Sequence, residues 1–243
     1  MVTYSFLSKT GGRTVNEDFV GVAKLETENL FVIADGLGGH GGGEVASRLA
    51  VEKAEEIFKT VQERNLPEQL AVCFQYAQDM LLKKQEEERK WGEMKTTMVL
   101  LVQRGNEALW GHIGDSRLYY FKKHRLKGRT YDHSVPQMLV DTGEIKEKEI
   151  RNHPDRNRLF RVLGTAWESP KYELAEPILM KDGESFLLCT DGFWELITEK
   201  EMSACLKKSK TPEEWLSQME KIVLEKGKKR EMDNYSALAV WLR

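Results

Sequence analysis

Apolar residues along the 243-residue chain follow two different periods. Short apolar runs at Val2–Lys9, Phe19–Leu25 and Leu30–Ala34 are typical of β-strands. Over Glu44–Arg64 and Glu68–Lys90 the apolar residues recur every three or four positions, which predicts two long amphipathic helices. The first part of the chain is therefore expected to fold as strands followed by a helix pair.

The rest of the chain repeats this order of strands and then helices. Strand patterns return in five places: Thr97–Gln103, Glu107–Ile113, Arg117–Phe121, Tyr172–Leu174 and Ser185–Thr190. Two helices are predicted over Glu199–Lys207 and Pro212–Lys226, and a last strand over Tyr235–Leu242. Because strands and helices come in blocks and do not alternate one by one, the pattern predicts a layered α+β domain.

The segment Tyr131–Gly164 interrupts this pattern. It is rich in Asp, His, Asn, Arg and Pro, and only Val135–Thr142 has a helical spacing. Connections of this kind often carry binding residues, so we expect a lid-like segment. Its arginines are expected to form a solvated face, with contact to an acidic phosphoprotein as the alternative; they are Arg151, Arg156, Arg158 and Arg161.

Acidic residues stand beside the predicted strands at five places: Glu17-Asp18, Asp35-Gly36, Asp115-Ser116, Asp191-Gly192 and Asp233-Asn234. A single Asp-Gly pair is a common turn signal. The runs before Asp35 and Asp191 are almost continuously apolar, however, and neither residue has an adjacent Lys or Arg. A buried carboxylate without a partner is costly, so we expect a bound cation at these positions.

The type of ligand restricts the kind of metal. Zinc and copper sites favour His and Cys, whereas carboxylate sites suit Mg²⁺, Mn²⁺ or Ca²⁺. Two such cations that share a carboxylate can hold a bridging water as hydroxide for attack at phosphorus. Arg13, four residues before Glu17, would suit recognition of phosphate oxygens. These residues predict a metal-dependent enzyme that acts on phosphate.

Composition argues against other classes of protein. Thirty-seven basic and 39 acidic residues leave a net charge of -2, which does not indicate binding to nucleic acid or to a membrane surface. The longest aliphatic stretch, Met98–Val102, is too short to cross a bilayer, and the N-terminus lacks the order of a signal peptide. Three widely spaced cysteines without a CxxC pair suit a reducing compartment. We expect a cytoplasmic protein.

Six short motifs occur in a fixed order: Gly12–Asp18, Ala34–His40, Gly114–Tyr119, Asp132–Ser134, Cys189–Gly192 and Asp233–Ser236. This series resembles that of the metal-dependent protein phosphatases of the PPM type (protein phosphatase 2C), in the form of a bacterial single-domain member. The match runs from Arg13 to Ser236. A site built from both ends of the chain predicts one domain over residues 1–243.

The resemblance implies both a fold and an activity. The fold is a four-layer α-β-β-α sandwich, with two antiparallel sheets flanked by helix pairs. The activity is hydrolysis of phosphoserine and phosphothreonine in proteins by direct attack of a metal-bridging hydroxide. The cofactors are two Mn²⁺ or Mg²⁺ ions, with a third as a further possibility.

The resemblance also assigns roles to the metal ligands. Asp35 would bridge the two cations, and the carbonyl of Gly36 would complete the coordination of one of them. Asp191 and Asp233 would bind the other cation. Asp115, together with Asp191, would support the third and weaker cation.

The remaining positions of the implied site act around the metals. Glu17 and Asp18 would hold metal-bound waters, and Arg13 would bind the phosphate. The catalytic set is thus Arg13, Asp35 and Asp191. The segment Tyr131–Gly164 matches the family's flap, a variable segment that influences substrate choice, and is called the flap below.

Two positions depart from the family pattern. Some members have a histidine directly after Asp-Gly, proposed to protonate the leaving group, where this chain has Leu37. His40 is the nearest alternative and would equally suit a structural turn, so no general acid is assigned. Lys95 stands where the family usually has glycine. None of these changes removes a metal ligand.

Two other functions stay open at this point. The chain could be a catalytically silent binding or regulatory module with the same fold, or a two-metal phosphodiesterase. The expected partners are phosphoproteins, including a serine/threonine kinase and its substrates, and the expected state is a monomer without nucleic acid or membrane. His112 and His133 are expected to be hydrogen-bonded structural residues and not ligands.

Overall fold

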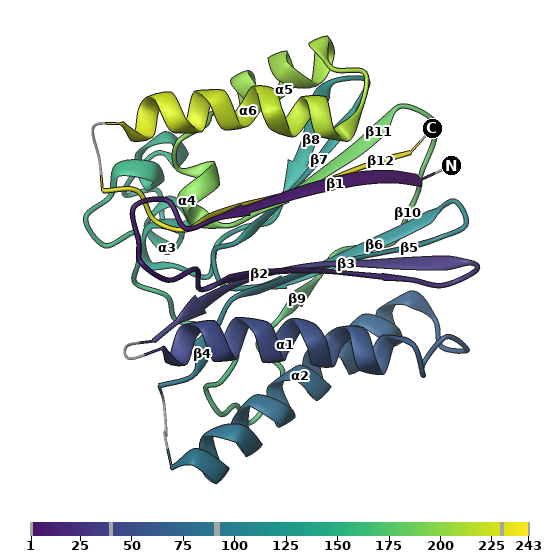
Figure 1. Cartoon of the computed structure of the whole chain (residues 1–243), viewed down its shortest axis with the longest axis vertical. Helices are drawn as coiled ribbons and strands as arrows, with labels where there is room; N and C mark the ends of the chain where they lie inside the picture. The colour runs from purple at the N-terminus through teal and green to yellow at the C-terminus, as the bar shows by residue number, and fades with distance from the viewer. Residues whose placement is uncertain (1, 39–40, 90–92, 229–230, 243) are drawn as a thin grey trace.

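The computed structural model describes residues 2–38, 41–89, 93–228 and 231–242. Two antiparallel β-sheets stack face to face, and a pair of long helices covers the outer face of each (Figure 1). This arrangement confirms the predicted fold class, an α+β sandwich of four layers in the order α-β-β-α.

The first sheet joins the two ends of the chain. Its strand order is β1 (Val2–Lys9), β12 (Tyr235–Leu242), β11 (Glu184–Cys189), β7 (Arg117–Lys122) and β8 (Arg125–Arg129). β1 and β12 pair along their whole length, from Val2 opposite Leu242 to Lys9 opposite Tyr235. The N- and C-terminal ends therefore lie side by side at one end of the sandwich (Figure 1).

The second sheet is centred on two apolar strands, β3 and β5. Its strand order is β10 (Ile178–Leu179), β6 (Glu107–Ile113), β5 (Met98–Arg104), β3 (Glu28–Leu37) and β2 (Asp18–Lys24), with β9 (Glu173–Leu174) paired to β6 and β4 (Lys95–Thr96) paired to β3. Helices cover one face of this sheet and the first sheet covers the other, which explains why β3 and β5 are almost continuously apolar.

Four long helices form the outer layers: α1 (Gly42–Phe58) and α2 (Leu66–Glu88) on the second sheet, α5 (Glu199–Lys208) and α6 (Pro212–Gly227) on the first (Figure 1). The side chain of Asn65 caps α2 by accepting a hydrogen bond from the backbone N–H of Glu68 at 2.9 Å. Thr198 and Glu201 form a capping box at the start of α5. Among the described residues, no helix combines the length and the apolar character needed to cross a membrane.

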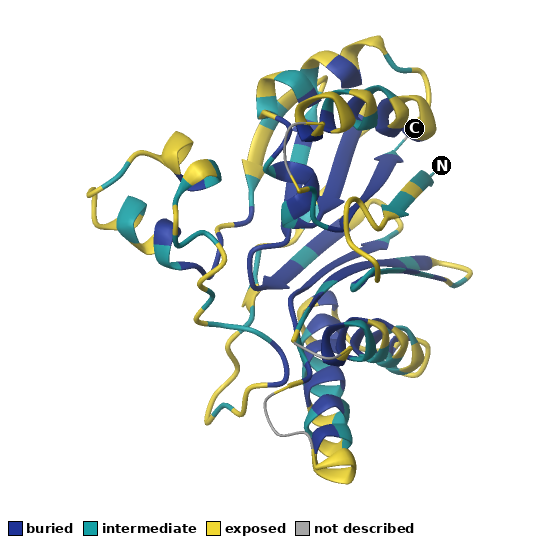
Figure 2. Ribbon diagram, turned by 60° about the vertical axis from the view of Figure 1, so that its left-hand side comes forward, coloured by how far each residue is buried: buried dark blue, intermediate teal, exposed yellow. Residues whose placement is uncertain are grey.

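Three apolar layers hold the sandwich together. One lies under each helix pair and one lies between the two sheets. The layer between the sheets includes Phe31, Leu118, Phe186 and Leu238, which have almost no exposed surface. Burial follows the sheets and the inner faces of the helices, whereas exposed residues gather on the outer faces and on the flap (Figure 2).

The structure differs from the sequence prediction in several elements. α1 ends at Phe58 and not at Arg64, because the residues after Phe58 form a turn. At the end of this turn the carbonyl of Arg64 accepts a hydrogen bond from the side chain of Arg104. β8 was not predicted, because its polar sequence is that of an edge strand with a single neighbour. β3 continues to Leu37, so Asp35 lies inside the strand and not at its end.

Three short helical elements lie at the end of the sandwich opposite the two chain ends. α3 (Val135–Asp141) was predicted almost to the residue, whereas the 3₁₀ helix η1 (Glu147–Asn152) and α4 (Asp191–Trp194) were not. Both missed elements span two turns or fewer, so they carry too few apolar positions to show a helical period. α3 and η1 belong to the flap, which extends sideways from the sandwich (Figure 2).

The apolar layer between the sheets is expected to carry much of the stability. Phe186→Ala should lower the free energy of unfolding by about 3–5 kcal/mol, because it leaves a cavity at a residue that is 1% exposed. Phe6→Ala is the matched control, because Phe6 lies on β1 and is 53% exposed; it should change stability by less than about 0.5 kcal/mol. Equilibrium unfolding in urea measures both. Equal losses in the two variants would contradict this assignment of the core.

Candidate metal centre

An open pocket of about 390 Å³ lies at the end of the sandwich opposite the two chain ends. Seven of the eight residues that the sequence proposed line it: Arg13, Glu17, Asp35, Gly36, Asp115, Asp191 and Asp233. They come from segments far apart in the sequence, so the fold brings them together. Asp18 is the exception, since it lies behind the pocket wall and is 4% exposed.

Asp18 and Asp35 are direct neighbours across two strands. Asp18 is the first residue of β2, and the register of β2 and β3 places it opposite Asp35. Directly opposite residues of an antiparallel pair point to the same face, with Cβ atoms about 5 Å apart. Two like charges in that position repel each other, which is unfavourable unless a cation or a proton lies between them.

Three other aspartates approach from the first sheet and from the loops. Asp191 is the first residue of α4, directly after β11. Asp233 lies just before β12, and Asp115 lies in the turn between β6 and β7 with only 5% of its surface exposed. β11 and β12 are neighbours in the first sheet, which explains why their flanking aspartates meet.

The N-terminal loop is tied to the C-terminal strand beside this pocket. The side chain of Asn234 accepts a hydrogen bond from the N–H of Glu17 at 2.8 Å and donates to the carbonyls of Thr10 and Val15 at 2.9 Å each. Arg13, in the same loop, contacts Asp233 at 3.0 Å, and its side chain is 53% exposed. The proposed phosphate-binding arginine is therefore at the pocket rim, paired with a proposed ligand.

Gly36 is required by the close packing behind the pocket. A Cβ atom at this position would lie 2.1 Å from the carbonyl oxygen of Gly43 and 2.8 Å from that of Glu17. No side chain fits there. The N–H of Gly36 donates to the carbonyl of Glu17 at 3.0 Å, which holds the N-terminal loop against β3.

Burial and mutual repulsion perturb the carboxylates of the pocket. The pKa values of Asp35 and Asp115 are raised well above the ordinary value of 3.8, first by burial and then by the charge of Asp191. Burial raises the pKa of Asp18 to about 7, and the charges of Asp191 and Asp233 add to this. Without cations, these groups therefore tend to hold protons.

The donors present fit divalent cations. The pocket offers carboxylate and carbonyl oxygens, and no cysteine or histidine is among its described lining residues. Oxygen-only sites suit Mg²⁺ and Mn²⁺. One oxygen of Asp18 accepts a hydrogen bond from Thr190 at 2.9 Å, whereas the other, Oδ1, is buried without a donor in the described chain. Asp18 lies opposite Asp35 in the strand pair, so water around a cation held by Asp35 would satisfy this orphaned acceptor.

Other pocket residues were not expected from the sequence. Asn157 and Leu159 of the flap line it, but nothing in a polar connection marks which residues turn inward. Leu37 also lines it, so the position where some relatives have histidine faces the site with an apolar side chain. Lys95 lies opposite Leu37 in the pairing of β3 and β4. His40 lies outside the described residues.

One expectation about the flap arginines is wrong. The side chain of Arg151 is 14% exposed and bonds to α4 and α5, so it does not belong to a solvated face. The sequence could not reveal this, because its partners lie more than 40 residues away. Arg158, by contrast, is 70% exposed as expected, and its ion pair is with the nearby Asp155.

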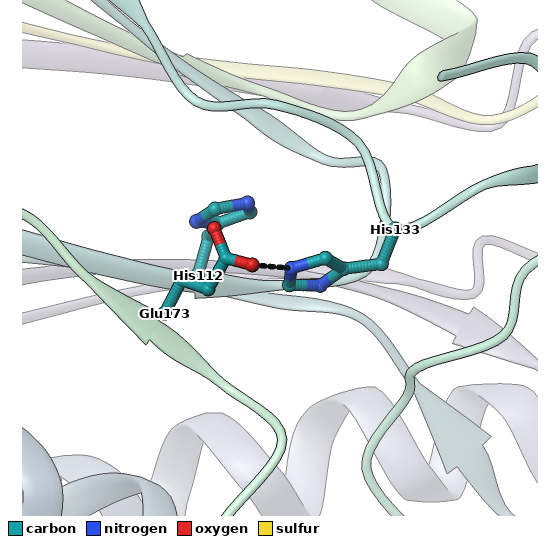
Figure 3. Close-up of side chains that lie close together, drawn as sticks. All are labelled: His112, His133 and Glu173. Carbon is teal, nitrogen blue, oxygen red and sulfur yellow. Dashed lines mark ion pairs between the residues drawn. The ribbon is translucent and has the colours of Figure 1, made fainter. Parts of the chain in front are cut away.

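A second cluster with the residue types of a metal site lies outside the pocket. His112, His133 and Glu173 lie close together, and Glu173 contacts Nε2 of His133 at 3.2 Å (Figure 3). The two imidazole rings are stacked, with centroids 4.6 Å apart and planes 12° from parallel. Ring nitrogens bind metals in the plane of the ring, so stacked rings do not direct their lone pairs at one ion.

The hydrogen bonds of this cluster also oppose a metal. Nδ1 of His133 accepts the N–H of Gly114 at 3.1 Å, so the hydrogen of the neutral ring is on Nε2, facing Glu173. Burial lowers the pKa of His133 to about 4, so the neutral ring predominates near neutral pH. Arg161 already contacts Glu173 at 2.7 Å and supplies the positive charge. His112 is also hydrogen-bonded, since its Nε2 lies 2.6 Å from the carbonyl oxygen of Tyr131, so both histidines make the hydrogen bonds that the sequence predicted. They link the flap to strand β6 and to the loop of Asp115.

Comparison with known proteins agrees with this geometry. A family model described as Protein phosphatase 2C matches residues 8–242. The serine/threonine phosphatase stp of Listeria monocytogenes serotype 4b is 32% identical over 201 residues, which cover 81% of this chain and 79% of that protein. The crystal structure of the Mycobacterium tuberculosis serine/threonine phosphatase PstP/Ppp superposes with a TM-score of 0.86 at 28% identity, covering 100% of this chain and 99% of that one.

A second solved structure bears on the cations. The catalytic domain of the serine/threonine protein phosphatase PstP, in complex with two manganese ions, has a TM-score of 0.83 and 27% identity, and covers 99% of this chain and 97% of that one. The fold and the acidic pocket thus define a metal-dependent phosphatase of the PPM type. The chain belongs to the protein phosphatase 2C family.

The raised pKa values predict how the metal-free protein responds to pH. The pKa of Asp18 is higher in the folded protein, about 7, than the ordinary value of 3.8 that applies to the unfolded chain. A carboxyl group of this kind stabilises the folded state below about pH 4, and this stabilisation is lost as the pH rises toward about 7. Asp18→Asn should therefore gain stability relative to the wild type as pH rises from about 4 to about 7. Thermal unfolding in EDTA across this range measures the difference.

The exposed Asp182→Asn is the control, and its difference from the wild type should not change over the same range. Mn²⁺ should stabilise the wild type more at high pH than at low pH, because only deprotonated carboxylates bind it. A constant difference between Asp18→Asn and the wild type from pH 4 to 7 would contradict the assignment.

Proposed function

We propose that this chain hydrolyses phosphoserine and phosphothreonine in proteins at the pocket formed by Asp35, Asp191 and Asp233. Family membership makes it a serine/threonine protein phosphatase, and the pocket supplies the groups that such a reaction needs. The observation that carries the proposal is the convergence of buried and half-buried carboxylates, which repel one another, beside a half-exposed arginine.

The residues proposed to hold two cations are the carboxylates of Asp35, Asp191 and Asp233 and the carbonyl of Gly36. Glu17 and Asp18 would accept hydrogen bonds from waters around them, which suits the orphaned oxygen of Asp18. When bound, the cations would lower the pKa of a water molecule and neutralise charge that develops on the phosphate. Mn²⁺ and Mg²⁺ both fit this donor set.

A third and weaker cation is proposed at Asp115. This side chain shares the pocket with Asp191, and its pKa is raised first by burial and then by the charge of Asp191. Repulsion of this kind is relieved by positive charge between the two groups.

Arg13 would orient the phosphate. Its guanidinium is paired with Asp233 at 3.0 Å, in half-exposed surroundings where such a pair is weak. A phosphate dianion offers Arg13 two further acceptor oxygens, which suits bidentate binding. The arginine can therefore bind a substrate phosphate from its present position at the pocket rim.

A covalent route through cysteine is disfavoured. Cys73, Cys189 and Cys205 are all buried free thiols, and none lines the pocket. Burial raises the pKa of Cys73 to about 12 and that of Cys189 further, so neither is a thiolate near neutral pH. The proposed reaction is a direct attack of water on phosphorus, which needs no such nucleophile.

The finer biological assignments are also proposals. Phosphoproteins are the proposed substrates, and a serine/threonine kinase with its substrates is the proposed set of partners. Unpaired thiols suit a reducing compartment, so the cytoplasm is the proposed location. The whole chain, residues 1–243, is proposed to act as one domain and as a monomer, since both ends of the chain build the pocket.

The two other functions have weaker support. A catalytically silent module would not need every acidic residue of the site, yet all are present in the pocket or directly behind it. A phosphodiesterase that acts on nucleic acid would be expected to have a basic groove, whereas the pocket has five carboxylates and one arginine among its described lining residues.

Activity should depend on Asp191 and on divalent cations. With Mn²⁺, the wild type should hydrolyse p-nitrophenyl phosphate and a phosphothreonine peptide, and EDTA should abolish both activities. Asp191→Ala should lower kcat at least about 100-fold on either substrate, because it removes a charged group from the reacting centre. Asp182→Ala, an exposed aspartate before β11, should keep full activity. Hydrolysis that survives EDTA, or that is equal in Asp191→Ala, would refute the proposed function.

A further inference from the structure

Trp194, the last residue of α4, lies where three parts of the molecule meet. Its indole is 1% exposed, and its Nε1–H donates to the backbone carbonyl of Asp115 at 3.0 Å. The same short helix begins at Asp191. One buried side chain therefore contacts the backbone of one proposed cation ligand and shares a helix with another.

Two arginines approach this indole. The guanidinium carbon of Arg117 lies 3.4 Å from the ring centroid and that of Arg151 lies 5.4 Å away, both within the range of cation–π contacts. Arg117 is held rigidly, because it donates to both oxygens of Asp132 at 2.7 Å and to the hydroxyl of Tyr119 at 3.0 Å. The ring is thus held from β7 by Arg117, whose partner Asp132 lies at the start of the flap.

Arg151 brings the flap to this ring. It belongs to η1 and donates through Nη1 to the backbone carbonyl of Trp194 and through Nη2 to Glu199 at the start of α5. Its neighbour Ile150 is 1% exposed and packs in the same apolar layer as Trp194. One guanidinium fork and one apolar side chain therefore attach η1 to α4 and α5.

The attached segment continues into the wall of the catalytic pocket. Asn157 and Leu159 follow η1 by only a few residues and line the pocket that Asp35 and Asp191 also line. At its other end the flap is bonded to the second sheet, because the N–H of Leu163 donates to the carbonyl of Thr96 in β4 at 2.9 Å. Docking of η1 on Trp194, together with the ion pair of Arg156 with Glu195 at 2.9 Å, therefore holds the pocket-facing part of the flap in place.

We propose that Arg151 is a positioning residue for polypeptide substrates: by fixing η1 on Trp194 it holds Asn157 and Leu159 at the mouth of the catalytic pocket. The inference rests on the proposed function, because the flap segment matters only if a polypeptide is bound there. A small phosphate ester reaches the aspartates and Arg13 without the flap. A phosphopeptide extends beyond its phosphate group, so its flanking residues would meet the pocket wall that Asn157 and Leu159 form.

The test compares two substrates in the full-length, Mn²⁺-loaded protein. Arg151→Met keeps the length and the apolar stem of the side chain but removes the fork. Since hydrogen bonds to charged groups are lost, KM for a phosphothreonine peptide of about ten residues should rise roughly tenfold. The value of kcat for p-nitrophenyl phosphate should stay within about twofold of the wild type, since no group at the reacting centre changes.

The matched control is Lys148→Met, which removes one positive charge one turn before Arg151 in η1. Lys148 is exposed and makes no ion pair within the described part of the chain, so both substrates should behave as with the wild type. Arg151→Lys keeps the charge without the fork and should recover only part of the peptide KM. Hydrogen exchange gives a readout besides activity, and amides of η1 should exchange about tenfold faster in Arg151→Met than in Lys148→Met.

The outcomes separate this inference from the proposed function. Unchanged peptide KM and unchanged exchange in Arg151→Met would overturn the positioning role. An equal loss on both substrates, with a folded protein by thermal unfolding, would also overturn it. If Arg151→Met does not fold, Glu199→Gln removes the charged acceptor instead and should show the same split. If the wild type hydrolyses neither ester, the proposed function fails, while the exchange measurement still decides whether Arg151 holds the flap.

Discussion

Repulsion among buried aspartates is the constraint on which the pocket depends. Asp18 faces Asp35 across a strand pair, and Asp191, Asp233 and Asp115 converge on the same end of the sandwich. Burial and these neighbouring charges raise the pKa values of Asp18, Asp35, Asp115 and Asp191. A fold that gathers such groups is stable only if protons or cations compensate them, and cations are what the proposed chemistry requires.

Favourable interactions in other parts of the sandwich offset the repulsion within this cluster. Three apolar layers fix the sheets, and Asn234 ties the N-terminal loop to the strand that closes the first sheet. Gly36 allows that loop to pass directly over β3. Because the ends of the chain meet at β1 and β12, the pocket forms only when the sheets are complete. Folding and assembly of the site are therefore one event.

Local signals in the sequence predicted a layered α+β domain and carboxylates at a cation site, whereas the four-layer order and the roles of the site residues came from the resemblance to the PPM family. The spacing of apolar residues distinguished the long helices from the strands. The apolar runs before Asp35 and Asp191 indicated buried carboxylates. It did not predict β8, since a polar edge strand has no apolar period, or the inward turn of Asn157 and Leu159. Arg151 was assigned to a solvated face because its contacts with Trp194 and Glu199 depend on tertiary structure alone.

The most direct test of the cation site is the stability of Asp35→Asn with and without Mn²⁺. At about pH 8 in EDTA, the variant should unfold at a higher temperature than the wild type, because an amide at this position needs neither a proton nor a cation to offset a charge. Addition of Mn²⁺ should raise the melting temperature of the wild type strongly and that of the variant little. If Asp35→Asn is less stable in EDTA and gains as much from Mn²⁺, the carboxylate cluster is not the cation site described here.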